Sequence, residues 1–565
     1  MKLSSFKKKL RSEFNENYNE NIVEKPRRKV KFELRLIPFY ALAAVLIISG
    51  ILFGIHISNG IPGRVLPDPA FSELEKLYLS NDYVPLEKME KAHFYEILGD
   101  KKNGDMYAFQ SHAWFSPVPS ETRSNPGTQF ETNNQEKGVI EGDIAKFDGN
   151  LCYYLYSDDV YHVESVLVIY DLAGNQLIKK ELDTRFEDIQ LYKNKIILYG
   201  FTGLAIYTFD TELIEVASYI GNRVETRLYQ NNLFVIFSTE TEYESNITFN
   251  DLYYDNITPI NRYMHLMKIN LDTLEKKEIG YLANYASVLY MNQSYMVICN
   301  KQEFSDDYRC FEYSINSVFT TDLEVVGCFV TRGYAIDQYA MDVCGDAFRI
   351  VTTGNDYIYD RDMNRMNHLY IFDLKAKELL SSIDDGIGLK DEMVTAVSFT
   401  DTRCYVVTYR NTDPVYEIDI TDSNHPKILG EIHVDGYSSY LKPFVVNNIE
   451  YLFGAGIIDS NYKYSIYTND GENHQLGEDY ILEGSPISSA INPHAMFFYL
   501  YQDILYVGAP HRDDVYILYK VDVSNEDNVI SQYKLIQTTK ETRLFLYEGK
   551  LYLPQPEELL VLDFE

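Results

Sequence analysis

The chain has 565 residues, which is long enough for a large buried core, and 14% of them are aromatic, with 49 Tyr and a single Trp. This composition favours β-structure. The formal net charge is −33, and it is unevenly placed: residues 1–35 contain 11 Lys and Arg against 5 Asp and Glu, so the remainder carries −39. An acidic domain of this size repels anionic polymers, which argues against a nucleic-acid partner.

The first predicted element is a membrane anchor over residues 36–57. The run "LIPFYALAAVLIISGILFGI" carries no charged side chain, and about 20 apolar residues in a helix cross a bilayer core. A cleaved signal peptide is the alternative, but the following residues offer no small-residue cleavage site. The basic residues 1–35 predict a cytoplasmic tail, because positive flanks stay inside. We therefore expect a single-pass protein of the cell membrane whose remainder is extracytoplasmic.

Residues 58–135 are predicted to connect the anchor to the main domain. They start as a linker, continue as a short helix in "PDPAFSELEKLYLSND", and include a strand within residues 90–130, for which "MYAFQSHAWF" at 106–115 is the candidate. We expect that strand to complete the last structural repeat and close the fold.

Residues 136–565 repeat a turn between two apolar, Tyr-rich runs. The turns read "FDGN" at 147, "YKNK" at 192, "YQNN" at 229, "YMNQ" at 290, "VCGD" at 343, "FTDT" at 399, "VVNN" at 445, "LYQD" at 500 and "YEGK" at 547. Asn, Asp and Gly favour tight hairpins. A further strand ending in Asp or Asn follows each turn, at Asp171, Asp210, Asn270, Asp373, Asp419, Asp522 and Asp563, and more weakly at Asn316 and Asn469.

Four-stranded repeats of roughly 40–50 residues are typical of β-propellers. We predict an all-β fold, a propeller of about eight four-stranded blades, with seven to nine allowed, because propellers seldom exceed eight.

From about residue 70 onward the chain resembles the bacterial secreted or membrane-anchored "beta propeller domain" proteins. The resemblance rests on "FSELEKLYL", on "TNNQEKGVIEGDIAKFDG" at 132–149, and on the block at 397–444. In the second motif Gly142 stands where the family has alanine, and Phe147 where it has threonine. The resemblance implies a propeller outside the membrane, and it implies no activity, because the family's biochemical role is not established.

Two candidate ligand-binding sites follow from the motifs. Glu141 and Asp143 flank Gly142, so in an extended chain both carboxylates share one face and can take a cation. Arg410, Thr412 and Asp413 lie in a predicted loop, where Arg410 can clamp a carboxylate. A structural role is the alternative at both places: a capped turn at Glu141 with Asp143 bonding backbone groups, and an Arg410–Asp413 pair before Pro414.

Metal and cysteine chemistry have weaker signals. "DRDMN" at 360–364 lacks the Gly and Glu of a calcium loop, so no cofactor is predicted, although weak Ca²⁺ binding by acidic loops at 355–367 and 467–479 stays open. Cys310 and Cys328 fall on successive predicted strands and are the candidate disulfide; buried thiols are the alternative. Catalytic motifs and metal-ligand spacings are absent from the sequence.

We therefore expect a binding or scaffold module for a protein, a peptide or a cell-envelope ligand. The alternatives are an enzyme that cleaves envelope polymers with carboxylates in the propeller channel, and a sensor that signals through the basic tail. The ligand and the oligomeric state do not follow from the sequence.

Overall fold

The nine turns marked in the sequence are hairpins in the computed structural model. It describes residues 83–88, 128–129, 133–157, 164–240, 252–254, 262–283, 287–305, 309–358, 364–389, 391–409, 413–434, 436–469, 473–483, 495–511 and 514–565. The chain divides into two compact units, Met1–Ala70 and Phe71–Glu565, and every described residue lies in the second. The predicted tail, anchor and short helix, and the strand at 106–115, lie outside the described residues.

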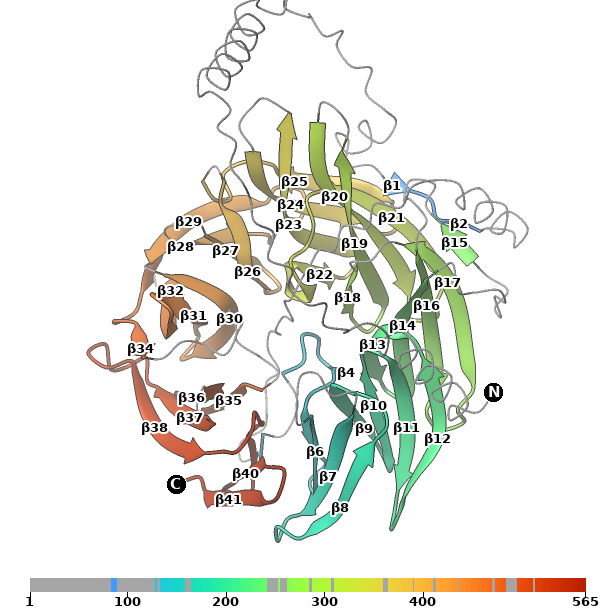
Figure 1. Ribbon diagram of the computed structural model, residues 1–565. Helices are drawn as coiled ribbons and strands as arrows, with labels where there is room; N and C mark the ends of the chain where they lie inside the picture. The colour runs from blue at the N-terminus through green and yellow to red at the C-terminus, as the bar shows by residue number, and fades with distance from the viewer. Residues whose placement is uncertain are drawn as a thin grey trace, which may run out of the picture. The chain divides into compact units, whose positions relative to one another are not determined.

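Each unit of the fold is an antiparallel sheet that begins with one of these hairpins. The sheets stand around a common centre, with the first strand of each on the inside (Figure 1). The first two sheets contain β5 (Ala145–Phe147), β6 (Leu151–Tyr156), β7 (Ser165–Asp171) and β8 (Gln176–Leu182), then β9 (Asp188–Tyr192), β10 (Lys195–Gly200), β11 (Gly203–Phe209) and β12 (Leu213–Ile220).

The next two sheets are larger because segments from elsewhere join them. The third contains β13 (Asn222–Tyr229), β14 (Asn232–Glu240), β16 (Arg262–Asn270) and β17 (Lys276–Ala283), with β4 (Val139–Ile140) on β13 and with β15 (Leu252–Tyr254) and β2 (Glu87–Lys88) on the outside.

The nine-stranded sheet joins two four-stranded units through β20 and β23. Its strands are β18 (Ser287–Met291), β19 (Tyr295–Ser305), β20 (Arg309–Thr320), β21 (Val325–Arg332), β22 (Met341–Cys344), β23 (Ala347–Ile358), β24 (Asn364–Asp373) and β25 (Glu378–Ile383), with β1 (Tyr83–Val84) on β21. A single 3₁₀ turn, η1 (Gln338–Ala340), precedes β22 and is the one helical element among the described residues.

The last four sheets complete the ring. They contain β26 (Met393–Phe399), β27 (Arg403–Tyr409), β28 (Asp413–Asp419) and β29 (Lys427–Val434); β30 (Tyr437–Val446), β31 (Ile449–Ile458), β32 (Asn461–Asn469), β33 (Asn473–Gln475) and β34 (Tyr480–Leu482); β35 (Phe497–Tyr501), β36 (Ile504–His511), β37 (Val515–Val521) and β38 (Ile530–Gln537); and β39 (Phe545–Tyr547), β40 (Lys550–Pro554) and β41 (Leu559–Asp563), with β3 (Thr128–Gln129).

Five of the Asp and Asn residues that end the third strands, Asp171, Asn270, Asp373, Asp419 and Asp522, cap the turn into the fourth. Asp373 Oδ1 accepts hydrogen bonds from the Lys375 and Ala376 N–H groups, both at 2.7 Å. Asp171 and Asn270 do the same in their own sheets. Asn316, by contrast, lies in the middle of the long β20. Thr320, at the end of β20, caps the turn from β20 into β21. The repeated Asp is therefore a structural residue.

The core lies between neighbouring sheets and uses tyrosine as a large apolar residue with a polar end. Where the β5–β8 sheet meets the β39–β41 sheet, a contact that we call the seam, Phe147 packs against Phe545, Tyr547 and Tyr552. Tyr154 Oη donates to the Glu541 carbonyl at 2.7 Å, and Tyr170 Oη donates to the Gln555 carbonyl at 2.8 Å. The first sheet and the last sheet are thus joined by side-chain packing and hydrogen bonds.

The strand β3 also reaches the last sheet. It pairs with β39, with Thr128 opposite Tyr547, so it joins that sheet at its inner edge. β41 is the outer strand of that sheet and pairs with β40 alone among the described strands, as β8 and β12 pair with one strand each in their sheets.

Candidate functional site

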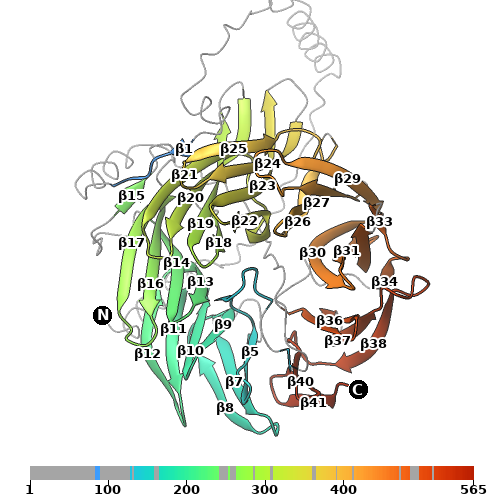
Figure 2. The same cartoon turned by 180° about the vertical axis from the view of Figure 1, so that it is seen from behind.

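The centre of the ring is occupied by residues 133–144, which we call the entry segment. Figures 1 and 2 show it in cyan among the inner strands. Within it β4 pairs with β13, and the backbone of Asp143 exchanges hydrogen bonds with Ile189 of β9, at 3.2 and 2.8 Å. Gln190 Nε2 donates to the Ile140 carbonyl at 2.9 Å. The segment therefore ties several sheets together before it enters β5.

Glu141 is buried and bonded within this network. Its Oε1 accepts from the Gln135 N–H at 3.2 Å and lies 3.8 Å from Arg227 Nε, and its Oε2 accepts from Gln338 Nε2 at 3.0 Å. The backbone carbonyl of Glu141 accepts from Lys146 Nζ at 2.6 Å. A buried charge is stable only when it is paired and hydrogen-bonded in this way.

Asp143 has a different partner from Glu141. Its Oδ2 pairs with the Arg543 guanidinium, which stands just before β39 and is 400 residues away in sequence. The exposed fractions are 0% for Asp143 and 2% for Arg543. The two carboxylates of the motif therefore do not form one site, because each holds a different part of the ring.

Gly142 lies between them where no side chain fits. A Cβ atom built on it would lie 1.7 Å from Tyr199 Oη and 2.8 Å from Asp188 Cβ. The tyrosine thus takes the space that a side chain at position 142 would need.

Burial shifts the pKa values of several ionisable groups around the entry segment toward their uncharged forms. Burial, with Asp342 nearby, raises the pKa of Glu136 to about 8. Burial, with Asp143 nearby, raises the pKa of Asp188 to about 7. Burial lowers the pKa of the Lys146 ammonium to about 8. Carboxylates from separate sheets thus converge here, which is typical of functional sites but also of structural ion networks.

The second predicted site is described only in part. Arg410 and Thr412 lie outside the described residues, and Asp413 begins β28 opposite Val434. The loop that holds them connects the second and third strands of its sheet. The acidic loops at 355–367 and 467–479 likewise include residues that the structure does not describe.

The candidate disulfide does not form, because the two cysteines are out of register. Cys328 of β21 faces Ser317 of β20, seven residues along that strand from Cys310. At about 3.3 Å per residue this is roughly 23 Å, far beyond the reach of a disulfide. The Cys328 thiol instead contacts the Val84 carbonyl at 3.1 Å. Burial raises the pKa of the Cys152, Cys299 and Cys404 thiols, as expected of inert core cysteines.

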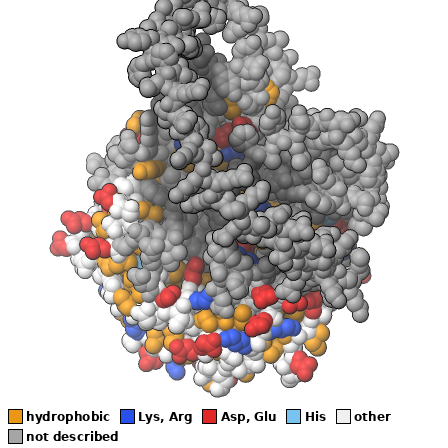
Figure 3. Space-filling view, viewed as in Figure 1, with side chains coloured by type: hydrophobic (Ala, Val, Ile, Leu, Met, Phe, Trp, Pro, Cys, Tyr) orange, Lys and Arg blue, Asp and Glu red, His pale blue; other side chains and the backbone are white. Residues whose placement is uncertain are grey.

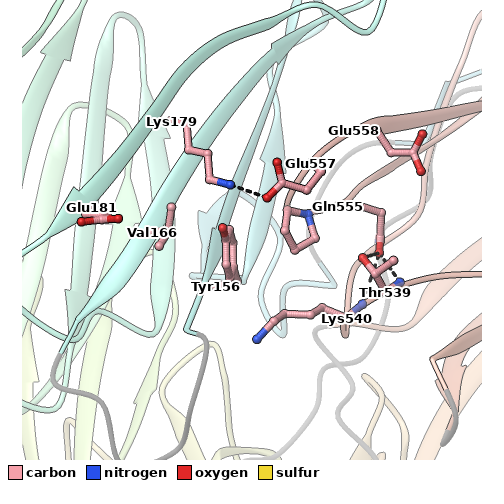
Figure 4. Close-up of a pocket in the computed structure, with 10 residues that line it drawn as sticks. Tyr156, Val166, Lys179, Glu181, Thr539, Lys540, Gln555, Glu557 and Glu558 are labelled. Atoms are coloured by element: carbon pink, nitrogen blue, oxygen red, sulfur yellow. Dashed lines mark hydrogen bonds and ion pairs between the residues drawn. The ribbon is translucent and has the colours of Figure 1, made fainter.

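A cleft of about 340 Å³ opens at the seam and was not foreseen from the sequence. Figure 4 shows its residues: Tyr156 and Val166 at the ends of β6 and β7, Lys179 and Glu181 on β8, Thr539 and Lys540 before β39, and Gln555 to Glu558 between β40 and β41. Lys179 Nζ spans it to Glu557 Oε1 at 2.5 Å. Lys540 Nζ donates to the Ser157 carbonyl at 2.7 Å and lies 5.5 Å from the Tyr156 ring centre.

Within the described part of the chain, no group of three or more His, Cys, Asp or Glu side chains is arranged to hold a metal ion. The described residues also contain no helix that is long and apolar enough to cross a bilayer.

An all-β ring of antiparallel four-stranded units whose first strands line the centre defines a β-propeller. Residues 216–463 match the family model described as "Beta propeller domain". A protein of Archaeoglobus fulgidus described as uncharacterised is 22% identical, over 83% of this chain and 87% of its own length. A similarly described protein of Methanocaldococcus jannaschii is 23% identical over 66% and 74%. These relatives are archaeal.

Solved structures with a similar arrangement include apo AztD from Citrobacter koseri, at 11% identity and a TM-score of 0.37, covering 71% of this chain and 95% of that one. The β-propeller domain of the Trilobed protease from Pyrococcus furiosus has 14% identity and a TM-score of 0.29, covering 60% and 96%.

Proposed function

We propose that this protein is a membrane-anchored, extracytoplasmic binding module that takes a protein, peptide or cell-envelope ligand in the seam cleft. The observation that supports this most is the contrast between the two concave regions. The entry segment fills the centre of the ring with its own paired charges, whereas the seam cleft, at about 340 Å³, has the size of a ligand site.

The lining of the cleft suits a ligand with both polar and apolar groups. Tyr156 and Val166 provide a buried apolar wall, while Glu181 and Glu558 are exposed carboxylates beside Lys179 and Lys540. On the side of the molecule that Figure 3 displays, acidic, basic and apolar side chains are interspersed among the described residues. A peptide segment with a basic side chain fits such a surface, because the exposed carboxylates can pair with it.

The test measures how much of the full-length protein sediments with purified cell-envelope fractions. We expect the double variant Glu181→Lys and Glu558→Lys to lose most of this binding, because the exposed carboxylates of the cleft are reversed. The matched control is Glu212→Lys, an exposed carboxylate in the turn between β11 and β12, which should bind normally. If the unmodified protein, the double variant and Glu212→Lys bind equally, the cleft is not the ligand site.

The enzyme alternative has one observation in its favour: carboxylates and tyrosines of different sheets meet at the entry segment. Tyr290 Oη of β18 donates to Glu136 Oε1 at 2.8 Å, and Asp342 of β22 raises the pKa of the same carboxyl. If this cluster is catalytic, Glu136→Gln, which keeps an acceptor for Tyr290, should abolish release of fragments from cell-wall glycan while the fold is kept. Absence of any release by the unmodified protein would end this alternative.

The anchor and its orientation are part of the proposal. They rest on the apolar run at 36–57 and the basic residues before it. Protease added outside intact cells should digest the domain and spare the tail; a fully protected chain would overturn the orientation. A sensor role through the tail requires that deleting residues 1–30 change a transcriptional response.

We also propose that the ring has nine blades, the upper end of the predicted range. The support is that each of the nine turns of the sequence lies between the first two strands of a unit, with the nine-stranded sheet counted as two units.

A further inference from the structure

The seam cleft contains two ammonium groups, although the net charge of the protein is −33. Lys179 lies on β8 of the first sheet, and Lys540 precedes β39 of the last sheet. Lys540 Nζ lies 5.5 Å from the ring centre of Tyr156. Contacts with Glu557 chiefly, and with Tyr156, raise the pKa of the Lys179 ammonium. The two ammonium groups therefore reach Tyr156 from opposite sides of the seam, as Figure 4 shows.

One of these ammonium groups is already paired with a carboxylate of the chain itself. Lys179 Nζ lies 2.5 Å from Glu557 Oε1, and the Glu557 side chain is 78% exposed. An ion pair in this setting is weak, because water screens the charges and two long side chains lose conformational freedom. Glu557 thus marks a place where a carboxylate fits, and a ligand that brings its own carboxylate can replace it with little loss of free energy.

A basic group and an acidic group follow each other along the wall that β8 provides. Lys179 and Glu181 both line the cleft and lie two residues apart, which is about 7 Å along a strand. Glu181 is opposite Val166 in the register of β7 and β8. A complementary ligand therefore has a negative group and a positive group at a similar separation, with an apolar group between them for the apolar wall.

Hydrogen bonds across the seam hold the two sides of the cleft together. Lys540 Nζ donates to the Ser157 carbonyl at 2.7 Å, and Tyr170 Oη donates to the Gln555 carbonyl at 2.8 Å. A peptide cannot thread between sheets that are joined in this way, so it has to enter from the surface. The cleft, at about 340 Å³, is also at the lower limit of ligand sites. Both features favour the end of a chain over a continuous segment.

We propose that the seam cleft binds the free carboxyl end of a peptide. The terminal carboxylate lies between Lys179 and Lys540 and displaces Glu557. The last side chain packs on Tyr156, and a basic side chain just before it pairs with Glu181. Capture of a terminal carboxylate is a recurring mode of peptide recognition. This inference rests on the proposed function, because it takes the seam cleft as the ligand site and specifies which part of the ligand enters it.

The experiment measures fluorescence polarisation of labelled peptides with the full-length chain. The probe is the tripeptide Ala-Lys-Leu, which carries the label at its amino end and has a free carboxyl end. We expect it to bind at one saturable site. The same peptide with an amide at its carboxyl end should bind at least about tenfold more weakly, because it lacks the charge that the two ammonium groups take.

A third peptide separates a terminal carboxylate from a side-chain carboxylate. Ala-Lys-Glu with an amide at its end carries a carboxylate only on its last side chain, and it should bind as weakly as the first amide. If it binds as well as the free carboxyl end does, the cleft takes acidic side chains and the proposal is wrong. Equal binding of Ala-Lys-Leu and its amide, or no saturable binding of either, would also overturn it.

Two variants and a control locate the carboxylate. Lys179→Ala should weaken binding of the free-end peptide at least about tenfold and leave that of the amide unchanged. Glu557→Gln removes the competing carboxylate, so the free-end peptide should bind about two- to fivefold more tightly. Lys180→Ala is the matched control: Lys180 is the next residue of β8, but its Nζ lies 5.4 Å from the Tyr207 ring of the second sheet, and binding should be normal.

The sedimentation test with envelope fractions distinguishes this proposal from the one on which it rests. If Glu181→Lys with Glu558→Lys loses envelope binding while Lys179→Ala keeps it, the cleft is the ligand site but a carboxyl end does not enter it, and only this proposal is wrong. If every cleft variant sediments normally while the free-end peptide depends on Lys179, the envelope function is wrong and the carboxylate site stands.

Discussion

At the scale of single residues, Gly142 shows how one atom constrains the centre of the ring. Adding a methyl group there should destabilise the protein by roughly 1–3 kcal/mol, because Tyr199 and Asp188 occupy the space. We expect Gly142→Ala to lower the urea midpoint of unfolding. The double variant Gly142→Ala with Tyr199→Leu should lose less stability than the two single changes together. Strict additivity would mean that the tyrosine is not the obstacle.

Glu136 should give stability a measurable dependence on pH. Its pKa is raised from 4.5 to about 8 in the fold, so the folded state keeps a proton that the unfolded chain has lost. The corresponding stability is fully present below about pH 4.5 and is lost as pH rises through 8. Asp188, with a pKa of about 7, acts in the same direction. His511, whose pKa burial lowers to about 4, acts in the opposite direction, but only below about pH 6.5.

Asp188 and Lys146 also titrate between pH 6.5 and 8, so the contribution of Glu136 is isolated by comparing Glu136→Gln with the unmodified protein in that window. Glu136→Gln resembles the protonated side chain, so relative to the unmodified protein it should gain roughly 2 kcal/mol across this window, at 1.36 kcal/mol per pH unit. Urea unfolding at pH 6.5, 7.2 and 8 measures this difference. Parallel profiles for the two proteins would show that Glu136 titrates normally.

At the scale of elements, the third-to-fourth strand hairpins depend on their capping carboxylates. Asp373 accepts two backbone hydrogen bonds in its turn, so Asp373→Ala should cost about 1 kcal/mol of unfolding free energy, as the loss of a comparable cap does. Asp373→Asn keeps an acceptor oxygen and should cost much less. Equal losses would indicate that the charge, rather than the bonds, stabilises the turn.

The ion pair between Asp143 and Arg543 connects the start of the ring to its last sheet. Arg543→Met should destabilise the protein by about 3–5 kcal/mol, because it leaves a carboxylate buried without its partner. The double variant with Asp143→Leu should recover much of that loss, since no isolated charge remains. Thermal unfolding of the two variants decides this; a double variant as unstable as Arg543→Met alone would contradict the pairing.

At the scale of the whole molecule, the ring is closed by side chains across the seam. Removing the hydroxyls in Tyr154→Phe and Tyr170→Phe leaves the Glu541 and Gln555 carbonyls without these donors, at about 1–2 kcal/mol each. Hydrogen exchange should then accelerate in β7 and β40 before it does in β28, which lies on the opposite side of the ring (Figure 1). Uniform acceleration would mean that the ring opens as one cooperative unit.

The sequence determined the repeating unit of this protein by itself, because hairpin turns and strand alternation are local. All nine turn signals fall between the first two strands of a unit, and the alternating residues Tyr416, Ile418 and Ile420 around the predicted strand end at Asp419 are buried. Two of the predictions from the sequence were wrong. Asn316 was misassigned because β20 is unusually long, and the Cys310–Cys328 pair because register along a strand is not visible in spacing.

Only the tertiary structure decided what the charged residues of the "IEGD" motif contact. The partners of Glu141 and Asp143 are Arg227, Gln338 and Arg543, up to 400 residues away, and no local pattern marks them. The seam cleft arises in the same way, from sheets that meet when the ring closes. Local chemistry sets how each sheet is made, and the closure of the ring sets which side chains meet.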